Sequence, residues 1–272
     1  MGGSQTQPQD LVLTLLGTYV QRRTRPVWSG GLVRLLADLG FSVGASRVAL
    51  ARMVTRGLLA RERTGRLVHY RLTPHCAALL DEGDTRIFAL GRQRNPGAAW
   101  TVLWHAIPDE RKLERSRLAR RLRFLGFGSL QDGTWIAARD REAEVVALLD
   151  DLEVCDYAGV MVGRPAASVD FARVVARAWD LRGLDERYRH FVRTFSPHAR
   201  EGAARRMTDL EAFTQRTHLV NAFRAFPSMD PELPLSVAPP PRHRDEAVSL
   251  FHRLYSGLAE PAQRYFDTVA PA

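Results

Sequence analysis

The sequence predicts an α+β protein with three consecutive parts: an N-terminal winged helix-turn-helix, a central ferredoxin-like domain and a C-terminal, mainly α-helical domain. Three observations predict this fold class. Helices joined by a tight glycine turn precede a short hairpin near the N-terminus. The middle of the chain alternates strands and helices, and the remainder shows helical apolar spacing. The expected domains span 10–91, 95–163 and 168–272, with linkers at Arg92 to Gly97 and Gly163 to Ala167.

The bulk composition is that of a globular protein. With 272 residues, of which 45% are hydrophobic, the chain can fill the cores of two or three units. It has no long uncharged apolar run, and its start lacks a basic segment followed by an apolar one. We therefore expect no membrane partner, no signal peptide and a cytoplasmic location. Cys76 and Cys155 lack disulfide or zinc partners, so we expect two buried hydrophobic residues, no metal and no cofactor.

The net charge favours a polyanionic partner. The formal charge is +9, and basic clusters bind a phosphate backbone by releasing its counterions. Lys112 is the sole lysine, so almost all of this charge is arginine, and genome composition can produce the same skew. The positions of the arginines are therefore more informative than their number.

The N-terminal domain begins with two helices. Asp10 is expected to cap a helix that runs to about Val20, and Pro26 to Trp28 break it. Ser29 is expected to cap the second helix, and Gly40 supplies a left-handed stop. Two short helices that meet across a tight turn at this glycine are typical of a helix-turn-helix.

A third helix, from Ser42 to about Arg56, has two distinct faces. The core face is formed by Ser46, Ala49, Leu50 and Met53. The opposite face carries Arg47, Val48, Ala51, Arg52 and Thr55. With Gly44 near its start, this face is narrow apart from its arginines, which suits insertion into a DNA major groove. An ordinary solvated face fits the helix alone equally well.

A basic hairpin follows and favours the first interpretation. Leu58 to Arg63 and Leu67 to Leu72 are strand-like and are joined by Thr64-Gly65-Arg66. A wing of this kind can place arginines on phosphates beside the groove. The residues predicted to bind DNA are Gly44, Arg47, Val48, Ala51, Arg52, Arg61, Arg63, Gly65 and Arg66.

The central domain has the order strand, helix, two strands, helix, strand, which predicts a ferredoxin-like unit. The expected elements are strands at 100–107, 127–130, 134–137 and 157–162, and helices at 108–125 and 141–152. Arginines on the first helix interleave with Glu110 and Glu114, which favours a solvated, salt-bridged face over DNA contact.

Around Trp104 to Glu110 this domain resembles the small ferredoxin-like endonucleases associated with CRISPR systems. The resemblance raises a metal-dependent nuclease as the alternative function. In that family a carboxylate at the end of the first strand is thought to hold the metal, and the matching position here is Ala106. We therefore expect an inactive domain without catalytic residues, and we expect Asp109 to cap the following helix.

The C-terminal domain carries stripes of apolar and aromatic residues at helical spacing. Two long helices are expected around the proline-rich loop Asp230 to Pro234. No serine, cysteine or histidine has a recognisable catalytic context, and no phosphate-binding glycine loop occurs. The aromatic stripes fit a packed core, and they also fit a pocket or dimer face for an aromatic ligand. Periodicity does not separate these two interpretations.

Nearly the whole chain resembles the PaaX-like repressors of phenylacetate degradation. The matching segments are Leu13 to Val20, Ala49 to Leu58, Arg63 to Arg66, Tyr70 to Thr73, Leu122 to Leu130, Trp135-Ile136, Trp179 to Leu181, Phe223 to Phe226 and Asp230 to Pro234. The resemblance implies a homodimer that represses catabolic genes and releases DNA when an aryl-acyl-CoA such as phenylacetyl-CoA binds. Ser236 to His243 depart from the family pattern, which leaves the identity of the effector open.

The sequence therefore predicts a DNA-binding transcriptional regulator and not an enzyme. Its expected partners are double-stranded DNA with an operator palindrome, a small-molecule effector whose binding residues are unknown, and a second copy of the chain. A metal-dependent nuclease is the alternative. A third hypothesis is an interaction module whose winged helix contacts another protein, and salt dependence of binding separates it from DNA recognition.

Overall fold

The computed structural model describes residues 8–21, 26–92, 99–166, 168, 170–200 and 206–271. The protein is α+β, as predicted, and forms two compact units. The first unit comprises Met1–Phe88, Phe191–Arg224 and Ser249–Ala272, and the second comprises Ala89–His190 and Ala225–Val248. The predicted linker Asn95-Pro96-Gly97 lies outside the described residues, as does Ala167. The C-terminal third of the sequence contributes to both units.

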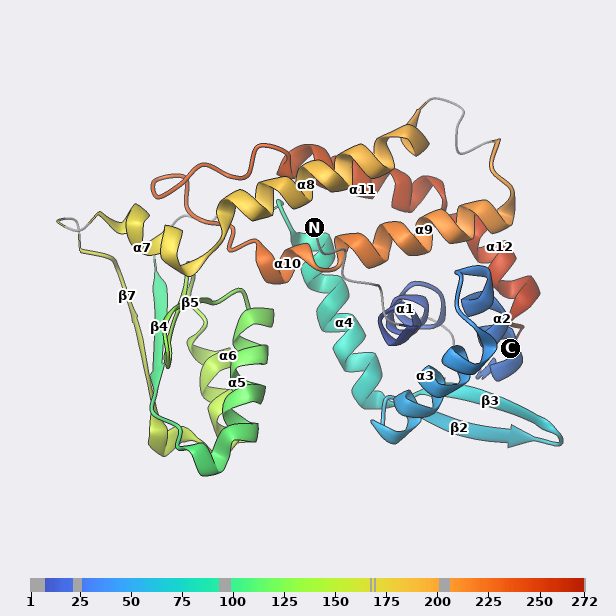
Figure 1. The fold of residues 1–272 in the computed structure, drawn as a ribbon, viewed down its shortest axis with the longest axis horizontal. Coiled ribbons are helices and arrows are strands. Elements are labelled where there is room, and N and C mark those ends of the chain that lie inside the picture. Colours follow the sequence, from blue (N-terminus) through green and yellow to red (C-terminus); the bar gives the residue numbers. More distant parts are fainter. Residues whose placement is uncertain are drawn as a thin grey trace. The chain divides into compact units, whose positions relative to one another are not determined.

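The first unit contains the winged helix-turn-helix (Figure 1). Its helices are α1 (Pro8–Leu15), which continues as the π-helix η1 (Leu16–Val20), then α2 (Ser29–Asp38), α3 (Val43–Thr55) and α4 (Pro74–Ala89). Its antiparallel sheet has the order β1-β3-β2, with β1 (Val27–Trp28), β2 (Leu59–Thr64) and β3 (Leu67–Leu72). The helices bury a leucine-rich core that includes Leu11, Leu15, Leu32, Leu35, Leu36 and Leu50.

Two of the predicted helix caps are wrong. Asp10 lies inside α1, because the helix already begins at Pro8, whose fixed φ favours the first turn of a helix. Ser29 is the first residue of α2, and no side chain caps that helix. The segment before Ser29 also forms strand β1, in which Val27 pairs with Tyr70 of β3. The prediction for Ser42 is confirmed, since its Oγ accepts a hydrogen bond from the Ala45 amide at 3.2 Å.

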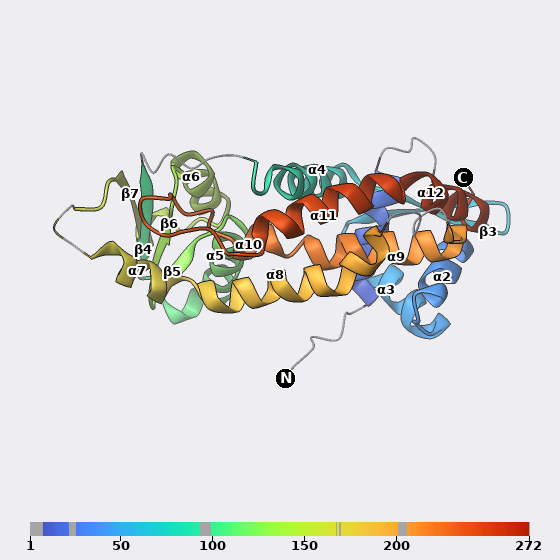
Figure 2. The ribbon, with the colours of Figure 1, turned by 90° about the horizontal axis from the view of Figure 1, so that it is seen from above.

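C-terminal helices complete the same unit (Figure 2). They are α9 (Asp209–Phe223) and α12 (Ala259–Val269), together with the ends of α8 (Leu181–Phe195) and α11 (Arg244–Gly257). Of the two long helices expected around the Asp230 to Pro234 loop, the first, α9, ends at Phe223, and the second, α11, is followed by the separate helix α12 after Leu258. Helix α9 contacts α1, and α12 contacts α2.

Polar and steric contacts hold these helices against the winged helix. The Arg224 Nη1 donates to the Asp10 carbonyl at 2.8 Å and to the Thr14 hydroxyl at 3.1 Å. The Tyr265 hydroxyl donates to Asp38 at 2.8 Å. A Cβ atom at Gly31 would lie 2.5 Å from the Ala270 backbone, so only glycine permits this close approach of α2 to the chain end. The C-terminal helices are therefore an integral part of the unit that carries the winged helix.

The second unit contains a four-stranded antiparallel sheet with the order β5-β6-β4-β7. The strands are β4 (Trp100–His105), β5 (Gly128–Gln131), β6 (Thr134–Ala137) and β7 (Ala158–Gly163). Helices α5 (Lys112–Phe124) and α6 (Glu142–Asp151) connect them, with short 3₁₀ turns at Asp109–Arg111 (η2) and Cys155–Tyr157 (η3). This order confirms the predicted ferredoxin-like topology.

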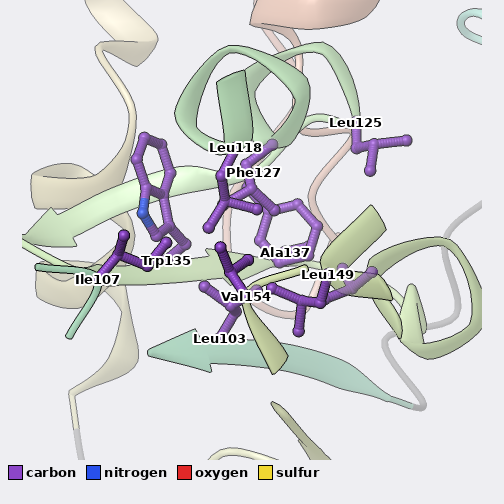
Figure 3. Close-up of a cluster of buried hydrophobic side chains, with 11 residues drawn as sticks. Leu103, Ile107, Leu118, Leu125, Phe127, Trp135, Ala137, Leu149 and Val154 are labelled. Carbon is purple, nitrogen blue, oxygen red and sulfur yellow. The ribbon is translucent and has the colours of Figure 1, made fainter. Parts of the chain in front are cut away.

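One face of that sheet packs against α5 and α6. The buried side chains between them, shown in Figure 3, are Leu103, Ile107, Leu118, Leu122, Leu125, Phe127, Trp135, Ala137, Val145, Leu149 and Val154. Trp100 and Ile136 on the opposite face pack against α7 (Phe171–Ala178) and Trp179. Phe171 meets Trp100 edge-on, with ring centroids 4.7 Å apart. Both faces are thus used for packing.

The loop after α10 (Phe226–Met229) is fixed by a buried polar network in the same unit. The Tyr188 hydroxyl donates to Asp230 at 2.8 Å, and the Tyr188 ring stacks on Phe226 with centroids 4.0 Å apart. Burial raises the pKa of the Asp230 carboxyl. Glu232 accepts bonds from the Gly91 amide at 2.9 Å and from Arg139 at 3.0 Å. These contacts give the Asp230 to Pro234 segment a structural role.

Two cysteine predictions have different outcomes. Cys76 is buried as expected, and burial raises the pKa of its thiol to about 11. Cys155 is exposed, because it lies in the 3₁₀ turn before β7, and its thiol donates to Asp150 at 2.9 Å. Each helix in the described ranges is too short or too polar to cross a lipid bilayer.

Candidate nucleic-acid interface

Helix α3 presents the face that the sequence predicts for DNA. It packs on α1 and α2 through Ser46, Ala49, Leu50 and Met53, which are all buried. The Ser46 hydroxyl, the polar member of this set, donates to the Ser42 carbonyl at 3.0 Å. The helix is therefore held by one face, and its other face is available for a partner.

All predicted contact residues on that outer face are exposed. They are Gly44, Arg47, Val48, Ala51 and Arg52. Val48 is 51% exposed, which is unusual for a large apolar residue and suits contact with a thymine methyl group. A Cβ built at Gly44 meets nothing within 4 Å, so the fold itself does not require glycine there. Neither arginine forms an ion pair with any other described residue.

The hairpin of β2 and β3 supplies the second set. Thr64 pairs with Leu67, so Gly65 and Arg66 form a two-residue turn, and Gly65 has a φ of +61° that favours glycine. Arg61, Arg63, Gly65 and Arg66 are all exposed. The Arg63 Nε donates to the Gly65 carbonyl at 3.2 Å. This bond lies beside the turn and leaves the remaining guanidinium donors of Arg63 available.

One carboxylate interrupts this basic surface. Between Ser42 and Leu72 the chain has seven arginines and a single acidic residue, Glu62. Arg71 donates to both oxygens of Glu62, at 2.6 and 3.2 Å. The Arg71 guanidinium lowers the pKa of the Glu62 carboxyl, which therefore stays ionised at neutral pH. Since Glu62 pairs with Arg71, it does not neutralise the arginines at the wing tip and on α3.

The two elements adjoin one another, because α3 contacts β2 (Figure 1). The structure therefore brings the nine predicted residues onto neighbouring elements of one unit. Val43 and Leu67, which the sequence pattern did not single out, are 47% and 51% exposed at the start of α3 and at the wing tip. They adjoin the predicted residues Gly44 and Arg66, so we add them to the candidate surface.

The nuclease alternative would need a carboxylate at the end of β4 to hold a metal. Ala106 follows the strand and offers only its backbone, whose amide donates to the Tyr157 carbonyl at 2.8 Å. The predicted capping role of Asp109 is wrong, because Asp109 lies within η2 and its carboxylate accepts from Arg115 at 2.9 Å. No cluster of three histidine, cysteine or acidic residues suited to a metal occurs in the described part of the chain.

Most arginines of α5 and its preceding turn already have partners. Arg111 bonds the Glu153 carbonyl and Arg115 pairs with Asp109. Arg121 lies 4.7 Å from the Phe124 ring centroid, and Arg123 lies 5.2 Å from that of Trp135. The ion pairs thus differ from the expected ones with Glu110 and Glu114. Arg117 and Arg120 are exposed and form no ion pair with a described residue.

Comparison with known proteins places the chain in a family. Three family models match it: "PaaX-like protein" over residues 7–76, "PaaX protein central Cas2-like domain" over 93–175 and "PaaX-like protein C-terminal domain" over 179–268. No curated protein shows significant sequence similarity to it.

A solved structure shares the fold. The uncharacterized protein Rv0674 from Mycobacterium tuberculosis is similar with a TM-score of 0.55 and 22% identity, and the match covers 98% of this chain and 99% of that one. At this identity the similarity concerns the fold alone. Because three consecutive family models match it, the chain belongs to the PaaX-like protein family. It has an N-terminal PaaX domain, a central Cas2-like domain and a C-terminal helical domain.

Proposed function

We propose that this protein is a sequence-specific DNA-binding transcriptional regulator that represses aromatic, phenylacetate-type catabolism genes. The observation that supports this most directly is the charge of α3 and the wing, where seven arginines face a single carboxylate that is already engaged. Membership of the PaaX-like family supports the same function.

The two elements would divide the work of recognition. Arg47 and Arg52 on α3 offer planar, multidentate donors that suit guanine edges in the major groove. Arg61, Arg63 and Arg66 on the wing suit phosphates, which fix the register on DNA without reading sequence. A homodimer would present two such surfaces to a palindrome whose half-sites are separated by whole helical turns.

Relief of repression would require an effector that prefers the DNA-free arrangement, because a ligand with equal affinity for both arrangements shifts nothing. The family resemblance suggests an aryl-acyl-CoA such as phenylacetyl-CoA. The C-terminal helices α9 and α12 contact α1 and α2 of the winged helix, which supports their role in transmitting such a response.

The test is binding of the purified protein to the DNA upstream of its own gene, compared with shuffled DNA of equal length and composition. At physiological salt we expect the natural fragment to bind on the order of a thousandfold more tightly. Phenylacetyl-CoA should release it, and free CoA serves as the control. Equal affinity for the natural and shuffled DNA would rule out a sequence-specific regulator.

The alternative function, a metal-dependent nuclease, has less support. Its expected ligand position is Ala106, and Asp109 is engaged by Arg115. Incubation of DNA and RNA with the protein in magnesium or manganese should give no cleavage. Cleavage that copurifies with the protein and is lost in Asp109→Ala would favour the nuclease instead.

A further inference from the structure

Leu67 is an exposed apolar residue at the tip of the wing. Its side chain is 51% exposed. Its partner across the hairpin is Thr64, which is exposed too. The next pair on the same face of the hairpin is formed by Glu62 and His69. The cross-strand neighbours of Leu67 are therefore polar, and the fold leaves about half of this apolar side chain in water.

The tip that carries Leu67 is short and held in place. It projects beyond the helices of the first unit (Figure 1). Gly65 has no side chain, and the bond from Arg63 to the Gly65 carbonyl braces the turn. Of the residues from Thr64 to Leu67, only Arg66 and Leu67 carry long side chains, and both are exposed. A surface that meets the tip therefore meets a guanidinium and an apolar side chain together.

The length of the wing matches the spacing of the grooves of DNA. The hairpin begins beside α3, where the Leu58 amide donates to the Met53 carbonyl at 2.9 Å. Strand β2 then runs over Leu59–Thr64, and at about 3.3 Å per residue its far end lies roughly 17 Å further along. A major groove and the next minor groove are separated by half a helical turn, which is also about 17 Å. With α3 in a major groove, the tip of the wing can reach the neighbouring minor groove.

The chemistry of that groove makes an apolar side chain selective. The minor groove is about 6 Å wide, so it admits the side chains of the tip but not the two-stranded ribbon behind them. Every base pair presents hydrogen-bond acceptors on its floor, and G·C pairs add the 2-amino donor of guanine. An apolar side chain pressed against that amino group shields it from water and offers it no acceptor, which is costly. The side chain therefore favours A·T pairs.

We infer that Leu67 is a specificity-determining residue, which lies in the minor groove beside each half-site and disfavours guanine there. Arg66, on the same tip, binds a phosphate at the edge of that groove. The inference rests on the proposed function, because it needs α3 in the major groove. It adds a preference for A·T pairs about half a helical turn from the bases that α3 contacts.

The test uses the DNA upstream of the protein's own gene in two base-substituted forms. Diaminopurine in place of adenine adds the 2-amino group to every A·T pair, and inosine in place of guanine removes it from every G·C pair. Both leave the hydrogen-bonding groups of the major-groove edges unchanged. We expect the full-length wild-type protein to bind the diaminopurine fragment about tenfold or more weakly than the natural one, and the inosine fragment no more weakly. Equal affinity for all three fragments, or an equal loss with inosine, would overturn the inference.

Variants then assign the effect to Leu67. In Leu67→Ser the side chain is shorter and its hydroxyl accepts a hydrogen bond from the amino group, so the loss caused by diaminopurine should shrink to about twofold or less. The matched control is Leu210→Ser, which changes a 40% exposed leucine in the first turn of α9, in the same unit, and should keep the full loss. Melting curves check that both variants are folded. A full loss in Leu67→Ser would reject this residue.

Shuffled DNA, with and without diaminopurine, separates this inference from the proposed function. Equal binding of natural and shuffled DNA, with a loss of affinity when either contains diaminopurine, would refute the sequence-specific regulator and leave the contact of Leu67 standing. Selective binding of the natural fragment without any loss caused by diaminopurine would do the reverse.

Discussion

Two helices of this protein, α3 and α5, are both rich in arginine, yet their charges are used differently. On α3 and the adjoining wing, Arg47, Arg52 and Arg66 are exposed and have no ion-pair partner among the described residues. Around α5, Arg115 pairs with an aspartate, and Arg123 lies over a tryptophan ring. The density of arginine therefore does not by itself distinguish a candidate nucleic-acid surface, and the local partners of each arginine must be compared as well.

The physical reason is the free energy needed to release an arginine from a carboxylate that it already pairs with. An arginine that binds a phosphate or a base edge must exchange water and nothing else, whereas an arginine held by a carboxylate must first break that pair. Val48 lies between Arg47 and Arg52 on α3, is exposed and can add an apolar contact. On α5 the residues between Arg117 and Arg120, Leu118 and Ala119, are buried and half-buried, so they offer no such contact.

The largest effect is expected for Arg47→Ala. Removal of a bidentate contact to a base should weaken operator binding by about 1–3 kcal/mol, roughly 5- to 150-fold, and relax the preference for one base pair. Anisotropy titrations against a set of operators with single base-pair changes measure both effects. An Arg47→Ala protein that keeps its full base preference would show that α3 does not read the groove.

A smaller effect is expected for Gly44→Ala. The added methyl meets nothing within 4 Å in the protein, and alanine favours a helix by up to about 1 kcal/mol, so the melting temperature should not fall. Operator affinity should fall several-fold because the methyl obstructs close approach of DNA. Gly83→Ala in α4, which also has open space, is the matched control and should leave DNA binding unchanged. Undiminished binding by Gly44→Ala would remove this residue from the interface.

Arg66→Ala tests the wing. Loss of one phosphate contact should weaken binding to all sequences alike and reduce the slope of log affinity against log salt by about one. The measurement is a salt titration with operator and shuffled DNA side by side. A loss confined to the operator would instead assign Arg66 to base recognition.

Much of this surface could be predicted because its determinants are local. The buried and exposed faces of α3 follow from helical spacing, and the wing follows from strands joined through Gly65. The sheet order of the second unit likewise follows from its sequence of elements. Strand β1 was missed because two residues carry no periodicity, and its pairing partner Tyr70 lies far along the chain.

The contacts that join the C-terminal helices to the winged helix could not be predicted for the same reason. Arg224 donates a hydrogen bond to the carbonyl of Asp10, which lies 214 positions earlier in the sequence, and no local sequence pattern indicates that partner. In the sequence Arg216 is an ordinary helical arginine, and its contacts with the rings of Tyr19 and Tyr255 are seen only in the structure. Sequence periodicity identifies which face is buried, whereas the partner on that face comes from tertiary structure.

The smallest effect is expected where α5 is most similar to α3. Arg117 and Arg120 of α5 are exposed and form no ion pair with a described residue, and unlike the exposed Arg123 they do not lie over an aromatic ring, so they are the best placed to bind phosphate. We expect Arg117→Ala/Arg120→Ala to change stability by less than about 0.5 kcal/mol and to leave operator affinity and its salt dependence unaltered, as for surface residues without packing partners. Salt titration alongside Arg66→Ala measures this. A slope reduced by one or two would show that lack of a partner, and not membership of the winged helix, determines which arginines meet DNA.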